Sequence, residues 1–551
     1  MGKKSRFIIL FFFILYPKIT SAQFTHADTL RGSINADRDW WDVLHYSVGV
    51  TPDFENKKIE GKVDIRFKVL YSGKRMQIDL QQPLILMKAF LGDSALVYTR
   101  EGNVYYLDVP FTLQNGAIKT LALRFSGNPI IAKSPPWDGG WIFQKDEKGR
   151  PWMSVACQGL GASAWYPCKD HQGDEPDGGA KLRITIPDTL IAVGNGRFTG
   201  KTSYGAGTMT WDWVVKDPIN NYNIIPYIGK YVNFNEVYRG EKGNLDMNYW
   251  VLDYNLEKAK KQFIDASKTM KAFEYWFGPY PFYEDGYKLV DAPYAGMEHQ
   301  SAIAYGNGYK NGYGGRDLSA TGWGMKWDYI IVHESAHEWF SNNITSKDIA
   351  DMWIHESFAN FSETLFTEYY FGKKAGSEYV IGLRKKIKND LPIIGAYGVN
   401  KEGSTDMYYK GANMLHTIRQ IINDDAIFRK ILRGFNKTFY HQTVTTKQIE
   451  DYMSKTSGKD LSKIFDQYLR TTMIPTLEYK TEKGILFYRW VNCVKGFNMP
   501  LKINKLKDQF SFIYPTEIFQ QTKINDKDLK VDDNFYIKTK SVNKVSTVDI
   551  K

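Results

Sequence analysis

Residues 333–337, which read His-Glu-Ser-Ala-His, restrict the fold of this 551-residue chain more than any other segment. They lie in a stretch, residues 325–345, whose apolar positions are spaced by threes and fours, and this spacing predicts a helix. Histidines four positions apart share one face of a helix, so both imidazoles can reach a single ion. Their nitrogens suit Zn²⁺ at ~2.0–2.1 Å. Glu334 is next to a ligand but angled away from the ion, which suits a base that deprotonates water.

A second predicted helix, residues 350–372, supplies a third ligand. Glu356 follows His337 by 19 positions, which leaves room for a turn and a crossing helix. It would complete a two-histidine, one-carboxylate site that keeps a position open for water, as in thermolysin-type hydrolases. The five-residue motif alone recurs by chance, and the alternative is a pair of ordinary core histidines with Glu334 as surface charge. Glu363, two turns further on, would either accept a hydrogen bond from a ligand histidine or be a solvated carboxylate.

The hydrophobic periodicity divides the chain into three parts. From about residue 46 to residue 234 apolar and polar positions alternate, which predicts strands. Helical spacing begins near residue 255, continues to Gly278-Pro279, and recurs in residues 411–422. From Leu477 the pattern is strand-like again. We therefore expect a multidomain α+β chain with a β domain at 40–235, a mainly helical domain at 236–474 and a small β domain at 475–551.

The first 22 residues predict a signal peptide. They combine a basic start, an apolar run too short to span a bilayer, and a small-residue cleavage site near Ala22. The alternatives are an uncleaved anchor or a buried strand. Removing the segment lowers the net charge from +11 to +7 and leaves no dense basic block, so we expect no nucleic-acid partner. We expect no membrane-spanning segment after this one, and a secreted or periplasmic protein.

Three cysteines, Cys157, Cys168 and Cys493, are too few for a disulfide framework. None has metal-ligand spacing. Buried thiols are expected, and a Cys157–Cys168 bridge in an oxidising compartment is the alternative.

Residues 293–300, which read PYAGMEHQ, separate this chain from other zinc hydrolases. With the zinc motif downstream, they resemble the zinc aminopeptidases related to aminopeptidase N and leukotriene hydrolase, a gluzincin family whose hallmark is Gly-x-Met-Glu-Asn. The resemblance implies that Glu298 holds the free α-ammonium of the substrate while Gly296 and Met297 dock the peptide as an extended strand. A carboxylate paired with an ammonium is a charge-assisted contact that an interior amide cannot make. Ala295 and His299 depart from the hallmark.

The resemblance covers about residues 40 to 475 and implies further roles. Gln158 would be a second contact for the substrate amine. Tyr408, in the segment YYKG at 408–411, would stabilise the oxyanion, with Tyr409 as a packing residue. Tyr294 would help to wall the first side-chain pocket or serve as ordinary aromatic packing. His355 and Ser357 stand where the family often has Asn and Gly.

For the fold, the resemblance implies a β-sandwich or saddle, then a thermolysin-like catalytic domain. For function, it implies one Zn²⁺ per chain and hydrolysis of the first bond of peptides with a free N-terminus. The oligomeric state is left open. The rivals are a thermolysin-like endopeptidase, which N-blocked substrates would distinguish, and a zinc-binding homologue without catalysis, which chelator-sensitive turnover would exclude.

Overall fold

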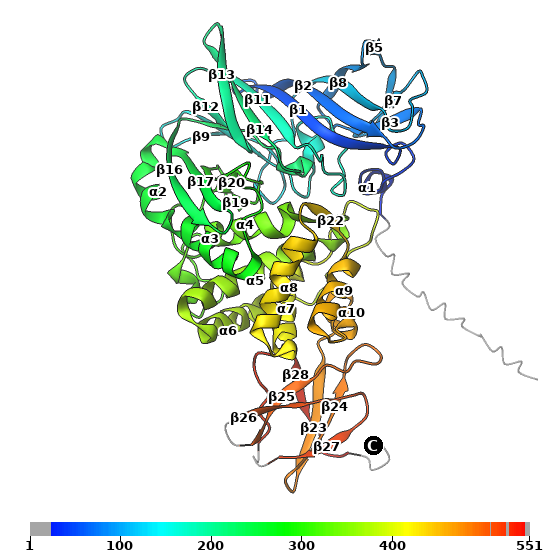
Figure 1. Cartoon of the computed structure of the whole chain (residues 1–551), viewed down its shortest axis with the longest axis vertical. Coiled ribbons are helices and arrows are strands. Elements are labelled where there is room, and N and C mark those ends of the chain that lie inside the picture. Colours follow the sequence, from blue (N-terminus) through cyan, green and yellow to red (C-terminus); the bar gives the residue numbers. More distant parts are fainter. Residues whose placement is uncertain (1–23, 507–508, 525–527, 546–551) are drawn as a thin grey trace, which may run out of the picture.

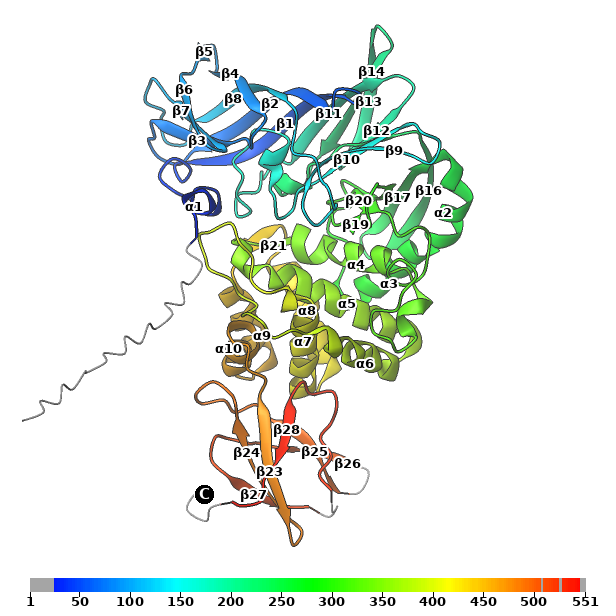
Figure 2. The ribbon, with the colours of Figure 1, turned by 180° about the vertical axis from the view of Figure 1, so that it is seen from behind.

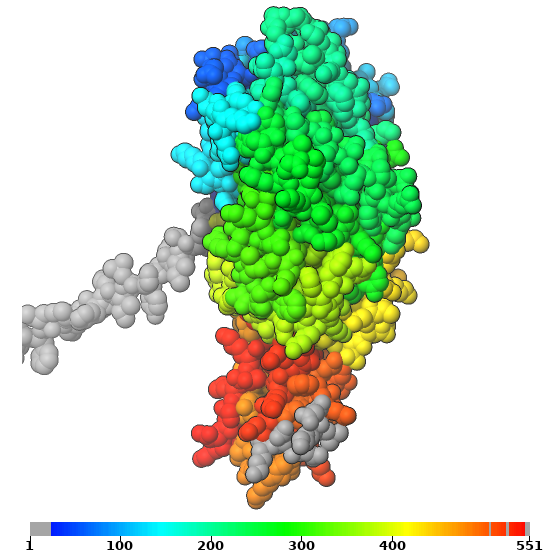
Figure 3. Space-filling view, turned by 90° about the vertical axis from the view of Figure 1, so that its left-hand side faces the viewer, coloured from blue at the N-terminus to red at the C-terminus, as the bar shows by residue number. Residues whose placement is uncertain are grey.

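The computed structural model describes residues 24–506, 509–524 and 528–545. The predicted signal peptide, residues 1–22, lies outside the described residues. Three parts follow one another along the long axis of the molecule, with β-rich parts at both ends and helices between them (Figures 1 and 2). The space-filling view shows these parts as one continuous body (Figure 3). This architecture confirms the predicted multidomain α+β fold.

The N-terminal part contains an eight-stranded sheet. Alternate side chains along its strands are apolar and pack into a buried core. Val63, Ile65 and Phe67, for example, are all fully buried. In sheet order, its strands are β13 (Arg197–Gly205), β14 (Thr208–Val215), β11 (Ala180–Pro187), β1 (Trp41–Asp53), β2 (Lys58–Val69), β8 (Ile118–Gly127), β4 (Ile85–Leu91) and β5 (Ser94–Ala95). Neighbouring strands are antiparallel except for the parallel pair β1 and β11.

Two smaller sheets and a short helix complete this part. One sheet runs β12 (Ile191–Val193), β15 (Tyr227–Gly229), β10 (Pro151–Ala156), β9 (Gly140–Lys145), and the other β3 (Arg75–Asp79), β7 (Val104–Asp108), β6 (Tyr98–Glu101). The helix is α1 (His26–Gly32), which Thr25 and Asp28 cap reciprocally.

The middle part combines a five-stranded sheet with helices. The sheet order is β16 (Tyr231–Gly240), β17 (Gly243–Leu252), β18 (Tyr287–Asp291), β20 (Ile303–Tyr305), β19 (Gly296–Met297). The helices are α2 (Leu256–Gln262), α3 (Ile264–Phe277), α4 (Tyr329–Ala336), α5 (Trp353–Phe371), α6 (Lys373–Gly382), α7 (Tyr409–Ile422), α8 (Asp425–Thr438), α9 (Thr446–Ser457) and α10 (Ser462–Arg470). A short parallel pair, β21 (Ile344–Ser346) and β22 (Gln442–Val444), joins distant segments.

Most helix predictions are confirmed. Helix α5 matches residues 350–372, and α7 contains residues 411–422. The helical pattern from residue 255 is two helices, α2 and α3, that meet at Phe263, and it ends at Gly278 with φ of 93°. The domain boundaries stay predictions, and the one proposed between residues 235 and 236 falls inside β16.

The prediction of one helix over residues 325–345 is wrong. A 3₁₀ turn, Trp323–Lys326, precedes α4, whose start is capped by the side chain of Asp328. Helix α4 ends at Ala336, and a π-type turn follows in which Ser341 has φ of 141°. Within this turn the carbonyl of Phe340 accepts a hydrogen bond from His337 Nδ1 (3.0 Å). In a continued helix this carbonyl would instead accept from the backbone N–H four residues later, so the bond to His337 competes with continuation of the helix.

The C-terminal part contains a four-stranded sheet, β27 (Gln520–Lys523), β24 (Ile485–Val491), β23 (Thr476–Glu482), β28 (Lys538–Ser541), and a pair, β25 (Leu501–Leu506) and β26 (Gln509–Ile513). One apolar core extends from the helices into these strands. Within the described ranges, no helix has the length and hydropathy needed to cross a membrane. All three cysteines lie in the described part and none is in a disulfide; Cys157 and Cys168 are buried thiols, as expected.

Candidate metal centre

Three buried side chains from two helices converge on one point. His333 and His337 lie at the end of α4, and Glu356 lies in the first turn of α5. Glu356 Oε2 is 3.7 Å from His333 Nε2 and 3.6 Å from His337 Nε2. Among the described residues this oxygen has no hydrogen-bond partner although it is buried. A buried carboxylate oxygen without a partner is costly, and a cation would stabilise it.

The far nitrogens of both histidines are already engaged. His333 Nδ1 lies 2.8 Å from Glu363 Oε1, which is the first of the two alternatives that the sequence left open for Glu363. His337 Nδ1 donates to the carbonyl of Phe340. These bonds leave both Nε2 lone pairs directed at the shared point, which is the arrangement that metal-binding histidines use. Two imidazole nitrogens and a carboxylate oxygen so arranged fit a zinc ion.

Glu363 is itself held in place. Its Oε2 accepts a hydrogen bond from the hydroxyl of Tyr379 (2.6 Å), and its Oε1 accepts one from Asn360 Nδ2 (2.8 Å). Tyr379 comes from α6, and no sequence pattern pointed to it. The orientation of His333 therefore depends on a hydrogen-bond network that reaches a third helix.

Glu334 faces the same space as the converging ligands. One oxygen of Glu334, one of Glu298 and a nitrogen of His337 lie within 4.8 Å of one another. Burial raises the pKa of Glu334 to about 8, and the nearby His333 opposes that rise. A bound dication would also oppose it, since positive charge favours the carboxylate. Gly296 confines the side chain, because a Cβ at that position would lie 2.8 Å from Glu334 Oε1.

The buried carboxylate of Glu298 lies directly after β19. Gln158 Nε2 and the hydroxyl of Tyr222 both donate to its Oε1, at 2.5 and 2.8 Å. Asn342 Nδ2 donates to its backbone carbonyl (2.8 Å). Burial raises the pKa of Glu298, and His337 opposes the rise. Both donors to the carboxylate are neutral and come from the N-terminal part, so the pocket spans the two parts. Tyr222 was missed, because nothing in the sequence distinguishes it among 36 tyrosines.

Tyr408 and Tyr409 diverge at the start of α7. The ring of Tyr408 lies 6.2 Å from that of His333 and nearly parallel to it. Burial and then Glu356 raise the pKa of Tyr408, so its hydroxyl stays protonated and can donate. The ring of Tyr409 instead faces Lys386, at 5.9 Å. Of the two, Tyr408 is the one beside the metal centre.

The segment before β19 is tied to its surroundings. The hydroxyl of Tyr294 donates to the carbonyl of Val155 in β10 (3.1 Å), and the carbonyl of Ala295 accepts from Gly306 N (2.8 Å). Met297 is buried in β19. The backbone of the predicted docking strand is therefore fixed despite the alanine at position 295.

The other residues that depart from the family pattern, His299, His355 and Ser357, make contacts within the fold. His299 is fully buried, with Nδ1 2.6 Å from the hydroxyl of Tyr227, and burial lowers its pKa to about 3. Burial therefore favours the neutral form of this imidazole. His355 Nε2 accepts from the backbone N–H of Ser346 (2.8 Å). Ser357 Oγ donates to the carbonyl of Met407 (2.6 Å), which links α5 to the segment that carries Tyr408.

Ser357 also meets Gly411 in close contact. A Cβ at Gly411 would lie 1.8 Å from Ser357 Oγ, so α7 can pack on α5 only with glycine there. We expect Gly411→Ala to lower the free energy of unfolding by about 1–3 kcal/mol through overpacking. Ser357→Gly removes the clashing atoms, so the double variant should recover part of that loss. Chemical denaturation of the two single variants and the double variant measures the coupling, and strictly additive losses would contradict it.

Comparison with known proteins agrees with this geometry. Residues 254–468, which include all three converging ligands, match the model for the peptidase family M1 domain. These residues therefore form a peptidase family M1 domain. Leukotriene A-4 hydrolase from Xenopus laevis is 20% identical over 86% of this chain and 79% of its own length. Aminopeptidase N from Lactococcus lactis subsp. lactis is 28% identical over 27% of this chain.

Several relatives are considerably longer than the region they share with this chain. The alignment spans 19% of the aminopeptidase N and 42% of a probable aminopeptidase 2 from Sulfurisphaera tokodaii. Among solved structures, the M1 zinc metallopeptidase from Deinococcus radiodurans has a TM-score of 0.67 at 20% identity. It covers 80% of this chain, and this chain covers 95% of that structure. This likeness establishes the M1 fold.

Proposed function

We propose that this chain is a zinc aminopeptidase that hydrolyses the first peptide bond of peptides with a free N-terminus. The observation that carries the proposal is the buried carboxylate of Glu298 beside the metal centre. Its two hydrogen-bond donors, Gln158 and Tyr222, are neutral, so its negative charge calls for a cation. The α-ammonium at the N-terminus of a peptide substrate is such a cation, and its position next to the first peptide bond fits a site beside the metal centre.

We assign one Zn²⁺ per chain to His333, His337 and Glu356. When bound, zinc would polarise the scissile carbonyl and lower the pKa of water to about 7. Glu334 takes a proton from the attacking water and returns it to the leaving amine. Tyr408 donates a hydrogen bond to the carbonyl oxygen as negative charge develops there.

Substitution of Glu298 tests the assignment of the amine pocket. Glu298→Ala should lower kcat/KM on an aminoacyl fluorophore by roughly 30-fold or more, since the ammonium would be buried without its partner. The N-acetylated version of the same substrate should be slow with wild type and should lose little further activity. Comparable losses on both substrates would favour an endopeptidase, and turnover that a chelator leaves unchanged would contradict a metal-dependent reaction.

A tighter test uses Gly296, where the atoms nearest an added Cβ belong to the proposed base, Glu334, and to Ile330. Gly296→Ala should lower kcat by about 10²-fold, because a shift of Glu334 by about 1 Å removes it from its working position. Zinc content should stay at the wild-type level. Gly49→Ala is the matched control, since its Cβ would meet only a carbonyl at 3.6 Å. Full activity in a folded Gly296→Ala variant would mean that Glu334 is not confined as described.

We also propose that the protein is exported. The support is the basic, apolar and small-residue order of residues 1–22. N-terminal sequencing of protein purified from its native host should begin near residue 23, and an intact Met1 would contradict export by cleavage.

A further inference from the structure

The segment that carries α1 lies between the N-terminal part and the M1 domain (Figures 1 and 2). On one side, Gln77 Nε2 donates to the carbonyl of Leu30 (2.9 Å). On the other, the backbone N–H of Asn400 donates to the carbonyl of Asp28 (3.0 Å). Gly32 packs so closely on the neighbouring M1 loop that a Cβ would lie 2.1 Å from its backbone. The helix is therefore fixed to both parts.

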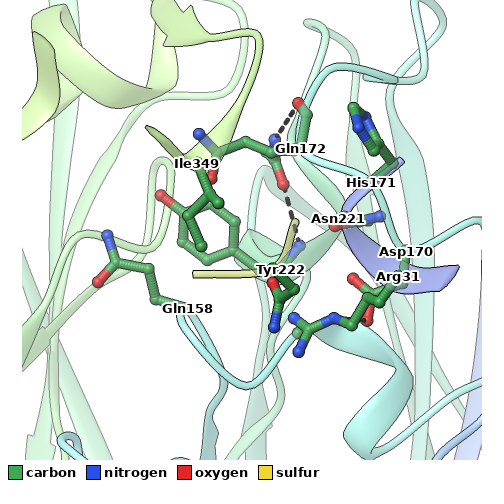
Figure 4. Close-up of a pocket in the computed structure, with 12 residues that line it drawn as sticks. Arg31, Gln158, Asp170, His171, Gln172, Asn221, Tyr222 and Ile349 are labelled. Carbon is green, nitrogen blue, oxygen red and sulfur yellow. Dashed lines mark hydrogen bonds and ion pairs between the residues drawn. The ribbon is translucent and has the colours of Figure 1, made fainter. Parts of the chain in front are cut away.

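Arg31 extends from this helix toward the amine pocket. Its Nε lies 3.2 Å from Asp170 Oδ2, and the two side chains are 19% and 5% exposed. The guanidinium packs against Gly161, where an added Cβ would lie 2.0 Å from Nη2. Arg31 and Asp170 form one side of a cavity of about 40 Å³, and Gln158 and Tyr222 line it as well (Figure 4).

Glu298 lies just beyond this cavity. Gln158 and Tyr222, which line the cavity, are the same two residues that donate to the carboxylate of Glu298. The thiol of Cys157 provides a second link. Burial raises its pKa, and Asp170, Arg31 and Glu298 all act on it. The ion pair of Arg31 therefore lines the same cavity as the two residues that hold the carboxylate of Glu298.

The remaining space is too small for another residue. At about 15 Å³ per water, 40 Å³ holds about three waters, and a glycyl unit adds four heavy atoms and needs a path for its own amine. That amine would also meet the positive charge of Arg31. Asp170 is a buried carboxylate that could hold an ammonium, but Arg31 already pairs with it.

We propose that Arg31 closes the substrate cleft behind Glu298, so that only one residue can precede the scissile bond. Its guanidinium occupies the place that the ammonium of a longer substrate would take beside Asp170. Removing this side chain opens a second subsite and adds dipeptide release to single-residue release. The inference rests on the proposed aminopeptidase function.

The experiment follows the products of glycyl-leucyl p-nitroanilide by mass spectrometry. Wild type should release glycine first and then leucine, with a lag before nitroaniline appears. Arg31→Ala should release intact glycyl-leucine, with the ratio of dipeptide to glycine rising at least about tenfold. Arg31→Ala with Asp170→Asn should give a smaller gain, because a neutral amide holds an ammonium less strongly than a carboxylate. In Arg31→Ala the Asp170 carboxylate keeps its hydrogen bonds from Ser163 but loses the positive charge of Arg31. The double variant removes that buried negative charge as well, so it provides the test if the single variant does not fold.

Two controls separate the possible failures. Arg75→Ala removes an exposed ion pair with Asp37 in the same part of the chain and should behave as wild type. Leucine p-nitroanilide reports the basal activity of every variant. A wild type active on it, with only glycine released by both folded Arg31 variants, would overturn the role of Arg31 alone. A wild type inactive on it would overturn the aminopeptidase proposal and this inference together.

Discussion

Glu334→Gln should bind zinc as wild type does and lose about 10²–10⁴-fold in kcat. The amide has the same shape as the carboxylate but cannot take a proton from water. The ligands His333, His337 and Glu356 keep their positions because Glu334 contributes no atom to their convergence. Initial rates on leucine p-nitroanilide and zinc content by atomic absorption measure the two properties in one preparation.

The matched control for this loss is Glu257→Gln. Glu257 is an exposed carboxylate in the first turn of α2, and its ion pair with Lys260 is also exposed. It should leave rate and zinc content unchanged. If Glu334→Gln retained a tenth or more of the wild-type rate, another group would have to be the base.

A second large loss of activity is expected from removing one of the proposed zinc-binding side chains, Glu356. Glu356→Ala should abolish stoichiometric zinc and, with it, turnover. Wild type treated with a chelator should unfold at a lower temperature, because zinc that binds only the folded chain stabilises it by mass action. The variant should already show that lower temperature and should not respond to added zinc.

Glu363→Gln provides a graded comparison, since Glu363 contacts His333 but not the point where the ligands converge. Loss of such a partner weakens metal affinity by about 10–100-fold without abolishing binding. Zinc titration should therefore rank wild type, Glu363→Gln and Glu356→Ala in that order. Stoichiometric, chelator-sensitive zinc in Glu356→Ala would remove Glu356 from the ligand set.

Local spacing accounts for the parts of the site that could be predicted. The positions of His333 and His337 on one turn of helix, and of Glu356 and Glu363 two turns apart on the next, follow from helical periodicity alone. The family resemblance added Glu298, Gln158 and Tyr408, and the structure brings all three to the metal centre.

Tertiary contacts account for what could not be predicted. Tyr222 reaches Glu298 across 76 residues of sequence, and its own segment has no motif. The end of α4 depends on the hydrogen bond from His337 to Phe340, which a periodic pattern does not encode. The position of α1 beside the amine pocket likewise depends on contacts with both larger parts of the molecule.

The amine pocket is shared between two separately built parts of the chain. The proposed zinc ligands and base belong wholly to the M1 domain, whereas Gln158 and Tyr222 reach Glu298 from the N-terminal part. The residues proposed for catalysis and those proposed for recognition of the substrate amine are therefore held in place by different parts of the fold. On the proposed function, a change that loosens the contact between the parts would erode selectivity for free N-termini while the metal centre keeps its residues in place. The enzyme would become less discriminating while it is still active.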